Sequence, residues 1–310
     1  MHTRRLGNTG LSVSEIGLGC NRLGESGRPH AHWLDLVRRA VDLGVTVFDT
    51  AEAYGWGASE SVLGEVLGNR DDVVVATKAS GPREGGEADF SAAHLQRTAE
   101  ASLSRLRRER IDVYQLHSPS REQLERFDWR EGMDRLKRKG AIGHAAVAVN
   151  NVDDATWLIE QDAVEVLQIT YNLFHTQAHE GLFDLAERKG VGLMARLPLA
   201  RGVLAGKFHP GQEVPDGHRA RLDDREKLVR RIALAEELKP LAENYPGGMA
   251  RLAMHFALMP GAISCLIPGA RTVEQLEANV AASNGRGLDE RTLAELDRIR
   301  ALWPREPGWY

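Results

Sequence analysis

The sequence alternates short apolar, β-branched runs with longer amphipathic stretches almost from one end to the other. The runs that we expect to form strands are residues 14–18, 46–49, 73–78, 111–117, 142–149, 166–170, 191–195 and 263–267. The stretches with a helical period of apolar residues are 32–43, 59–67, 92–106, 131–138, 153–159, 182–188, 249–258 and 273–282. This alternation is typical of parallel strands joined by helices. Eight of each over about 250 residues predicts a closed (β/α)8 TIM barrel, and a doubly wound open sheet is the alternative.

Several segments lie outside this repeat. Residues 6–11 predict the turn of an N-terminal β-hairpin, because Asn and Gly tolerate positive φ. Residues 201–221 are rich in Gly, Pro and charge, which favours a lid or clamp, and a helical pattern follows as far as residue 238. An extra C-terminal helix is expected over 290–302. The tail that follows, with Trp303 and Trp309, is expected either to reach across the barrel mouth or to pack on the outside of the barrel. No linker interrupts the alternation, so we expect a single domain over residues 1–310.

The composition argues against several classes of protein. The chain has 310 residues and a formal net charge of −4, which gives no reason to expect nucleic acid or an anionic membrane as partner. No run approaches the ~20 apolar residues of a membrane span, and the start of the chain does not resemble a signal peptide. Cys20 and Cys265 are the only cysteines, without disulfide or metal-type spacing. These features predict a cytoplasmic protein with no metal site.

Polar residues stand where three of the predicted strands end. Asp49 ends the second run, Lys78 the third and His117 the fourth, and Tyr54 follows Asp49 by five residues. Catalytic groups of such folds gather at the carboxyl ends of the strands, so these side chains are expected to meet in one site. Taken singly, each has an ordinary structural explanation, such as a buried histidine or a helix cap. Four of them at neighbouring positions favour a catalytic site.

This set of side chains is suited to delivering a proton to an oxygen. A phenol is a poor proton donor at neutral pH, whereas a nearby ammonium group stabilises the phenolate. Asp49 is expected to pair with Lys78, and His117 is expected to hydrogen-bond a substrate oxygen. No nucleophile elbow or metal cluster accompanies them, so a hydride for reducing a carbonyl has to come from a cofactor.

The motifs around these residues resemble those of the aldo-keto reductase family. The matching segments are 48–55, which contains Asp49 and Tyr54, 76–78, which ends in Lys78, and 114–117, which ends in His117. The similarity extends from residue 5 to residue 279. It implies a (β/α)8 barrel that binds NADPH in an extended pose, with Tyr54 as the general acid.

The resemblance also implies cofactor contacts. Gln168 matches the glutamine that holds the nicotinamide carboxamide, and Arg196 stands where relatives place a residue against the nicotinamide ring. Residues 202–207 match the loop over the pyrophosphate, where the expected contacts are Gly202, Leu204, Gly206 and Lys207. Pro198 and Leu199, which follow Arg196, are expected to contact the cofactor as well.

The start of the last barrel helix is suited to a phosphate. A helix N-terminus presents unpaired N–H groups, and Arg271 adds a guanidinium that is able to grip a 2′-phosphate. Gln275 and Asn279 are four residues apart, hence on one helical face that could read the adenine edge. Relatives keep two further phosphate ligands where this chain has Gly269 and Ala270, and Gly269 is among the expected cofactor contacts. We therefore expect NADPH/NADP+ as cofactor, with a preference that rests mainly on Arg271.

One position departs from the family pattern. Relatives usually have Ser, often Ser-Asn, at the end of the fifth strand, where these side chains bind the carboxamide. This chain has Ala148 and Val149, which have no side-chain donor. Asn150, Asn151 or a water molecule is expected to take over that contact, or the nicotinamide is held less tightly.

The sequence therefore predicts an NADPH-dependent reductase of an aldehyde, ketone or sugar carbonyl. The same four residues serve an NAD(P)-dependent sugar or polyol dehydrogenase working in the oxidative direction, which is one alternative. A non-catalytic, cofactor-binding regulatory subunit is another, although the intact set of four residues argues against it. The sequence decides neither the small-molecule substrate nor the oligomeric state.

Overall fold

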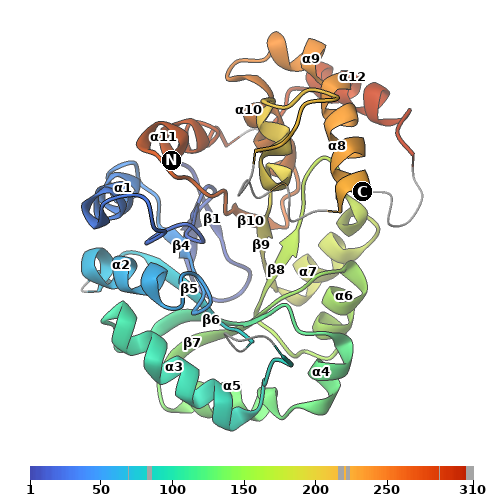
Figure 1. Cartoon of the computed structure of the whole chain (residues 1–310). Coiled ribbons are helices and arrows are strands. Elements are labelled where there is room, and N and C mark those ends of the chain that lie inside the picture. The colour runs from blue at the N-terminus through green and yellow to red at the C-terminus, as the bar shows by residue number, and fades with distance from the viewer. Residues whose placement is uncertain (69, 82–85, 216–219, 221–223, 286, 305–310) are drawn as a thin grey trace.

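Figure 1 shows the computed structural model of the chain, which describes residues 1–68, 70–81, 86–215, 220, 224–285 and 287–304. The strands are β1 (Thr3–Arg5), β2 (Ser12–Ser14), β3 (Leu18–Gly19), β4 (Val47–Asp49), β5 (Val74–Ala79), β6 (Ile111–His117), β7 (Ile142–Ala148), β8 (Val166–Thr170), β9 (Gly192–Arg196) and β10 (Ile263–Leu266). The helices are α1 (His30–Asp42), α2 (Ala58–Leu67), α3 (Ala92–Leu106), α4 (Arg121–Arg126), α5 (Trp129–Arg138), α6 (Val152–Glu160), α7 (Leu182–Lys189), α8 (Arg225–Glu237), α9 (Lys239–Glu243), α10 (Gly248–Ala257), α11 (Val273–Val280) and α12 (Glu290–Arg300), with 3₁₀ turns η1 (Gln177–His179) and η2 (Ala200–Ala205). None of the helices in these described ranges is long and apolar enough to cross a membrane.

Strands β3 to β10 follow one another around a parallel sheet, with the helices on its outer side (Figure 1). The first and last strands also meet. Ile16 pairs with Leu266 and Gly19 with Gly269 in parallel bridges, and the N–H of Gly17 donates to the carbonyl of Leu266 at 2.8 Å. These bonds close the sheet. The predicted (β/α)8 barrel is confirmed and the open-sheet alternative is wrong.

The interior of the barrel is filled by alternate residues of its strands, because successive side chains of a strand point to opposite faces. The buried interior cluster contains Val47, Val74, Ala76, Val113, Ala146, Val166, Met194 and Cys265. Two residues further along the same faces stand Asp49, Lys78, Gln115 and Gln168. The interior is therefore apolar toward the amino ends of the strands and polar toward their carboxyl ends.

The N-terminal hairpin of β1 and β2 contributes to this apolar interior cluster. Thr3–Arg5 pairs antiparallel with Ser12–Ser14, and Leu6 and Val13 belong to the buried interior cluster. Gly7, in the turn, has φ +53° and lies so close to β9 that a Cβ atom would come 2.4 Å from the carbonyl oxygen of Gly190. Only glycine fits there without displacing backbone, so the turn seats the hairpin against the end of the barrel.

Most predicted elements begin and end within two residues of the observed ones, with one clear error. The first barrel strand was expected at residues 14–18 but is observed as β3, Leu18–Gly19. Ser14 instead ends the hairpin, opposite Thr3. Its hydroxyl donates to the carbonyl of Ile16 at 2.8 Å, a local bond that turns the chain before the barrel strand starts.

The extra segments also differ in part from the expectation. Helix α4 was not predicted, although Ser120 and Gln123 form a capping box at its start. Trp303 is buried in the core, with its ring 5.6 Å from that of Phe174 and its Nε1 donating to Glu237 of α8 at 2.9 Å. Trp303 therefore connects the C-terminal end of the described chain to α8. Trp309 and residues 216–219 and 221 of the expected lid lie outside the described residues.

Candidate active site

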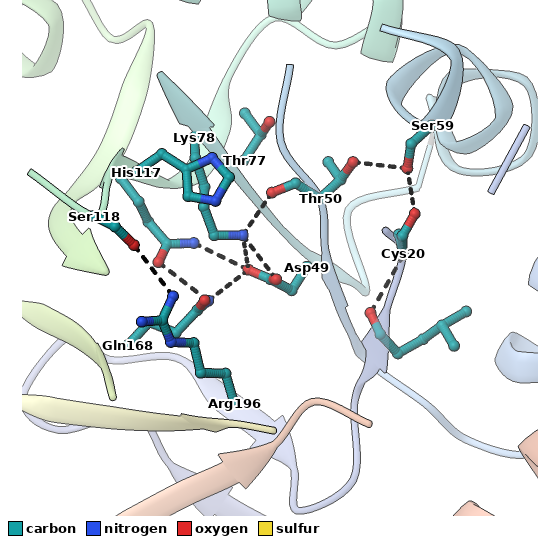
Figure 2. Close-up of polar contacts among 12 residues, drawn as sticks. Cys20, Asp49, Thr50, Ser59, Thr77, Lys78, His117, Ser118, Gln168 and Arg196 are labelled. Atoms are coloured by element: carbon teal, nitrogen blue, oxygen red, sulfur yellow. Dashed lines mark hydrogen bonds and ion pairs between the residues drawn. The ribbon is translucent and has the colours of Figure 1, made fainter. Parts of the chain in front are cut away.

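A buried ion pair joins the ends of β4 and β5. Lys78 has no exposed surface and Asp49 is 3% exposed. The Lys78 Nζ lies 2.7 Å from both carboxylate oxygens of Asp49 and 2.7 Å from the carbonyl oxygen of Thr50 (Figure 2). All three ammonium hydrogens therefore have acceptors, which is what a buried charge requires. The pair fixes a positive charge at the carboxyl end of the barrel.

Two buried glutamines complete the hydrogen bonds of Asp49. Gln115 Nε2 donates to Asp49 Oδ1 at 3.1 Å, and Gln168 Nε2 donates to the same oxygen at 2.8 Å. Gln168 Nε2 is also 3.2 Å from Gln115 Oε1. Because a carboxylate only accepts hydrogen bonds, these contacts fix which end of each amide faces Asp49. Gln168 accordingly turns its Oε1 away from the carboxylate, and no group in the described residues donates to that atom.

Tyr54 lies on the turn between β4 and α2, beside the ion pair. The N–H of Tyr54 donates to the carbonyl of Ala51 at 3.0 Å, and its own carbonyl accepts from Ser59 at 3.2 Å. Ser59 also bonds Thr50 and the carbonyl of Cys20, both at 2.8 Å (Figure 2). These bonds tie the turn to two strand ends. They bring the Tyr54 ring to within 5.3 Å of Lys78 Nζ, measured to the ring centre.

His117, the last residue of β6, faces Tyr54. The two ring centres are 5.8 Å apart in an edge-on arrangement. Burial, followed by the charges of Lys78 and Arg196, lowers the pKa of His117 from 6.5 to about 3. The imidazole is therefore neutral at physiological pH. Its Nδ1 is 2.7 Å from the hydroxyl of Ser80, so Nε2 is the nitrogen left for another partner.

Arg196 spans the carboxyl ends of four neighbouring strands. Its guanidinium donates to Thr170 at 3.2 Å, to Ser118 at 3.2 Å, and to the carbonyl of Val149 at 2.9 Å. It also donates to Asn150 Oδ1 at 2.9 Å. These contacts place a permanent positive charge beside His117, as the lowered pKa of that histidine reflects.

The position where this chain departs from the family pattern, at the end of β7, has well-defined neighbours. Ala148 is fully buried and pairs in register with His117 on one side and Gln168 on the other. The Asn151 side chain caps α6, accepting from the N–H of Asp154 at 2.7 Å. Asn150 is exposed, and its only side-chain bond in the described residues is the one from Arg196. Of the two asparagines, Asn150 is thus the one whose amide nitrogen is available.

The loop after β9 is backbone-strained, which is a feature of ligand-binding loops. Leu197, Ala200 and Arg201 have φ of 57°, 45° and 55°, in the left-handed region that side chains usually avoid. The segment contains the expected cofactor contacts Pro198 and Leu199, and also the residues that the sequence linked to the pyrophosphate, namely Gly202, Leu204, Gly206 and Lys207. Gly202 and Gly206 have φ of 97° and 75°, and the Lys207 side chain is exposed. Consecutive left-handed residues shape a backbone concavity of the kind that binds anions.

The residues expected at the adenosine end form a separate group at β10 and α11. The N–H of Arg271 donates to Gln275 Oε1 at 2.8 Å, and Asn279 Nδ2 donates to the carbonyl of Gly269 at 3.3 Å. Arg271 is half-exposed, and its guanidinium lies 3.4 Å from a carboxylate oxygen of Glu25. A Cβ atom on Gly269 would come 3.3 Å from Asn21 Oδ1, so the absence of a side chain keeps this edge open.

The sequence interpretation missed three residues of this region: Ser80, Gln115 and Glu25. The first two carried a usable signal. Ser80 follows Lys78 by two positions and Gln115 precedes His117 by two, so each shares a strand face with a predicted site residue. Glu25 lies in an irregular loop, where no period links it to Arg271.

Comparisons with known proteins agree with this geometry. Residues 15–301 match the model of the aldo/keto reductase family. The chain is 37% identical to the oxidoreductase Rv2298 of Mycobacterium tuberculosis over 310 residues, covering 96% of this chain and 92% of that protein. It is 30% identical to L-galactose dehydrogenase of Arabidopsis thaliana over 321 residues, covering 97% and 96%.

A solved structure is similar along its whole length. The aldo-keto reductase AKR11C1 from Bacillus halodurans, in its holo form, superposes with a TM-score of 0.81 at 25% identity and covers 100% of both chains. The match of the family model over most of the sequence, with these relatives, shows that the chain belongs to the aldo/keto reductase family of oxidoreductases.

Proposed function

We propose that this protein is an NADPH-preferring reductase of an aldehyde, ketone or sugar carbonyl, built on one barrel domain, with Tyr54 as the proton donor. The observation that carries this proposal is the buried Asp49–Lys78 pair with the Tyr54 ring centre 5.3 Å from Lys78 Nζ. A fixed cation beside a phenol stabilises the negative charge that develops on the phenol oxygen as its proton leaves. Asp49 keeps that cation in place, with both carboxylate oxygens 2.7 Å from Lys78 Nζ.

His117 is suited to orient the carbonyl that receives the proton. It is neutral, because burial and the charges of Lys78 and Arg196 lower its pKa to about 3. When the Ser80 hydroxyl donates to Nδ1, the ring proton stands on Nε2 and is available to the substrate oxygen. The edge-on contact of the Tyr54 and His117 rings supports a shared oxygen for the two donors.

The described residues also fit a nicotinamide dinucleotide. Gln168 Oε1 and the Asn150 amide nitrogen are an acceptor and a donor suited to a carboxamide. The strained loop after β9 fits a pyrophosphate, and Arg271 with the start of α11 fits a 2′-phosphate. When bound in reduced form, such a cofactor supplies the hydride that carbonyl reduction needs.

A dehydrogenase working in the opposite direction is the second candidate. The support for it is the 30% identity to L-galactose dehydrogenase over nearly the whole chain. The same phenol, once deprotonated, accepts the proton of an alcohol, so the site residues serve both directions.

A substrate panel tests the proposal. The full-length protein is incubated with aldehydes, ketones and sugars plus NADPH, and with the matching alcohols and sugars plus NADP+, while absorbance of the reduced nicotinamide is followed. Reduction that Tyr54→Phe abolishes is the expected result. Turnover in the oxidative panel alone would favour the dehydrogenase. Tight cofactor binding without turnover in either panel would contradict both and favour a regulatory role.

A further inference from the structure

Arg271, on which the proposed NADPH preference rests, is already paired with a carboxylate. Its Nη2 lies 3.4 Å from Oε2 of Glu25, in the loop between β3 and α1. The two side chains are 50% and 30% exposed. Figure 1 shows α1 and α11 side by side, so this loop and the start of α11 meet at one edge of the barrel.

The position of the Glu25 carboxylate is set by its surroundings. Its Oε1 forms an ion pair with Arg22. The backbone is held as well, since the N–H of Glu25 donates to the carbonyl of Arg22 at 3.2 Å and Trp33 Nε1 donates to the carbonyl of Glu25 at 3.3 Å. Trp33 is buried in the core, which anchors the loop. The carboxylate is therefore directed at Arg271 by the fold.

Glu25 Oε2 is unusual for a charged oxygen. It is buried and accepts no hydrogen bond in the described residues, although it faces Arg271. Buried carboxylate oxygens normally have donors, so this atom is an acceptor that still lacks one. Its burial also means that solvent screens its charge less than that of a surface carboxylate.

The Arg271 backbone is equally fixed. Its N–H donates to Gln275 Oε1, and its carbonyl accepts from His32 Nε2, both at 2.8 Å. Loop and helix thus present the guanidinium and the carboxylate together. A ligand group that approaches Arg271 meets the charge of Glu25 at the same time.

The two forms of the cofactor differ in charge at this point. A phosphate monoester carries about −1.5 to −2 at pH 7, so a 2′-phosphate competes with Glu25 for Arg271 and is repelled by it. A 2′-hydroxyl is neutral and is able to donate to an acceptor such as Glu25 Oε2. In other dinucleotide sites, an acidic residue accepts a hydrogen bond from the ribose 2′-hydroxyl of NAD. In sites for NADP, an arginine accommodates the 2′-phosphate.

We propose that Glu25 is a specificity-determining residue that opposes the 2′-phosphate at Arg271 and allows NADH to be used beside NADPH. This inference rests on the proposed cofactor site. Arg271 creates a preference for NADPH over NADH, and the charge of Glu25 reduces that preference. Removing the charge of Glu25 therefore increases the preference for NADPH.

Binding of two adenosine fragments to the full chain tests this without reference to turnover. Adenosine 2′,5′-bisphosphate carries the 2′-phosphate of NADPH and 5′-AMP lacks it, and both are titrated calorimetrically. In Glu25→Gln the affinity for the bisphosphate rises at least about fivefold, because a like charge is removed beside the phosphate. The affinity for 5′-AMP stays the same or falls, and the KM ratio of NADPH to NADH falls in parallel.

Glu277→Gln is the matched control. Glu277 lies on α11 and pairs with Arg39 at 2.6 Å, so this variant also removes one carboxylate charge, on the helix that follows Arg271, without removing the partner of Arg271. It should leave the ratio of the two affinities within about twofold of the original protein. Glu25→Asp keeps the charge and should behave more like the original protein than Glu25→Gln does.

Two results would overturn the inference in distinguishable ways. If Glu25→Gln changes the affinity for both fragments equally, or lowers the affinity for the bisphosphate, Glu25 only shapes the loop. Either result would leave the proposed function intact. If the unaltered protein binds neither of the two fragments and neither NADPH nor NADH, the proposed cofactor site is wrong, and the inference about Glu25 is wrong with it.

Discussion

Lys78 Nζ lies 2.7 Å from each carboxylate oxygen of Asp49, and both side chains are almost completely buried. Removal of one partner leaves an uncompensated charge in the barrel, which costs about 3–5 kcal/mol. Lys78→Met and Asp49→Asn should each lower the free energy of unfolding by that order, measured in urea, and each should nearly abolish carbonyl reduction. The double variant, with no buried charge, should recover much of the stability and none of the activity. Recovery of activity would show that the pair is only structural.

The acid sensitivity of the fold should depend on His117. Its pKa is about 3 in the folded protein and near 6.5 when unfolded. Between these values the unfolded chain binds more protons, so the stabilising contribution is complete above pH 6.5 and is lost as pH falls toward 3. His117→Gln should therefore lose less stability between pH 7 and pH 5 than the original protein, by urea unfolding at both values. His179 and His255, whose pKa values burial also lowers, are present in both proteins and cancel in the comparison.

Ala148→Ser should tighten cofactor binding modestly. Ala148 lies between His117 and Gln168 in the register of the sheet. A hydroxyl there would be next to Gln168, the residue proposed to accept from the carboxamide of the nicotinamide. A new neutral hydrogen bond contributes about 0.5–1.5 kcal/mol, which is roughly a two- to tenfold lower Kd for NADPH by fluorescence titration. A higher Kd would mean that the site is built around alanine and that Asn150 supplies the contact. Asn150→Ala distinguishes these cases, since it weakens binding only in the second.

Arg271→Ala should raise the KM for NADPH tenfold or more and leave the KM for NADH nearly unchanged. A hydrogen bond to a charged group contributes about 1.5–3 kcal/mol, and only NADPH has the 2′-phosphate. Steady-state kinetics with both cofactors measure the effect. Equal losses with NADPH and NADH would indicate that the contact of Arg271 with Gln275 shapes the loop and that phosphate recognition lies elsewhere.

The sequence was sufficient to predict the barrel and the place of the polar residues within it. Period-two faces and helical periods repeat eight times. The polar side chains follow directly from counting along the strands, since Asp49 and His117 end β4 and β6 and Lys78 is the residue before the end of β5. The one misplaced strand, β3, has only two residues, and the bonds of Ser14 that separate it from the hairpin involve Thr46 and Ile16. Thr46 is 32 residues from Ser14, and a local pattern does not contain such a long-range partner.

The hydrogen bonds within the site could not be predicted. Gln168 was expected only as a cofactor contact, yet its amide nitrogen is already bound to Asp49, 119 residues away. The pairing of Glu25 with Arg271 likewise joins two irregular loops that meet only because the barrel closes. Contacts between loops depend on closure of the sheet, which no single segment encodes.

The central claim is that Tyr54 gives the proton, and its hydroxyl is the most direct place to test it. Tyr54→Phe removes only that hydroxyl, so the ring contact with His117 at 5.8 Å and the proposed cofactor contacts are expected to persist. With the best carbonyl from the substrate panel, single-turnover oxidation of bound NADPH should slow by about 10²–10⁴-fold, the usual contribution of a general acid. The Kd for NADPH, measured on the same samples, should stay within about twofold. A variant that binds NADPH normally and still reduces the carbonyl at close to the original rate would contradict the account.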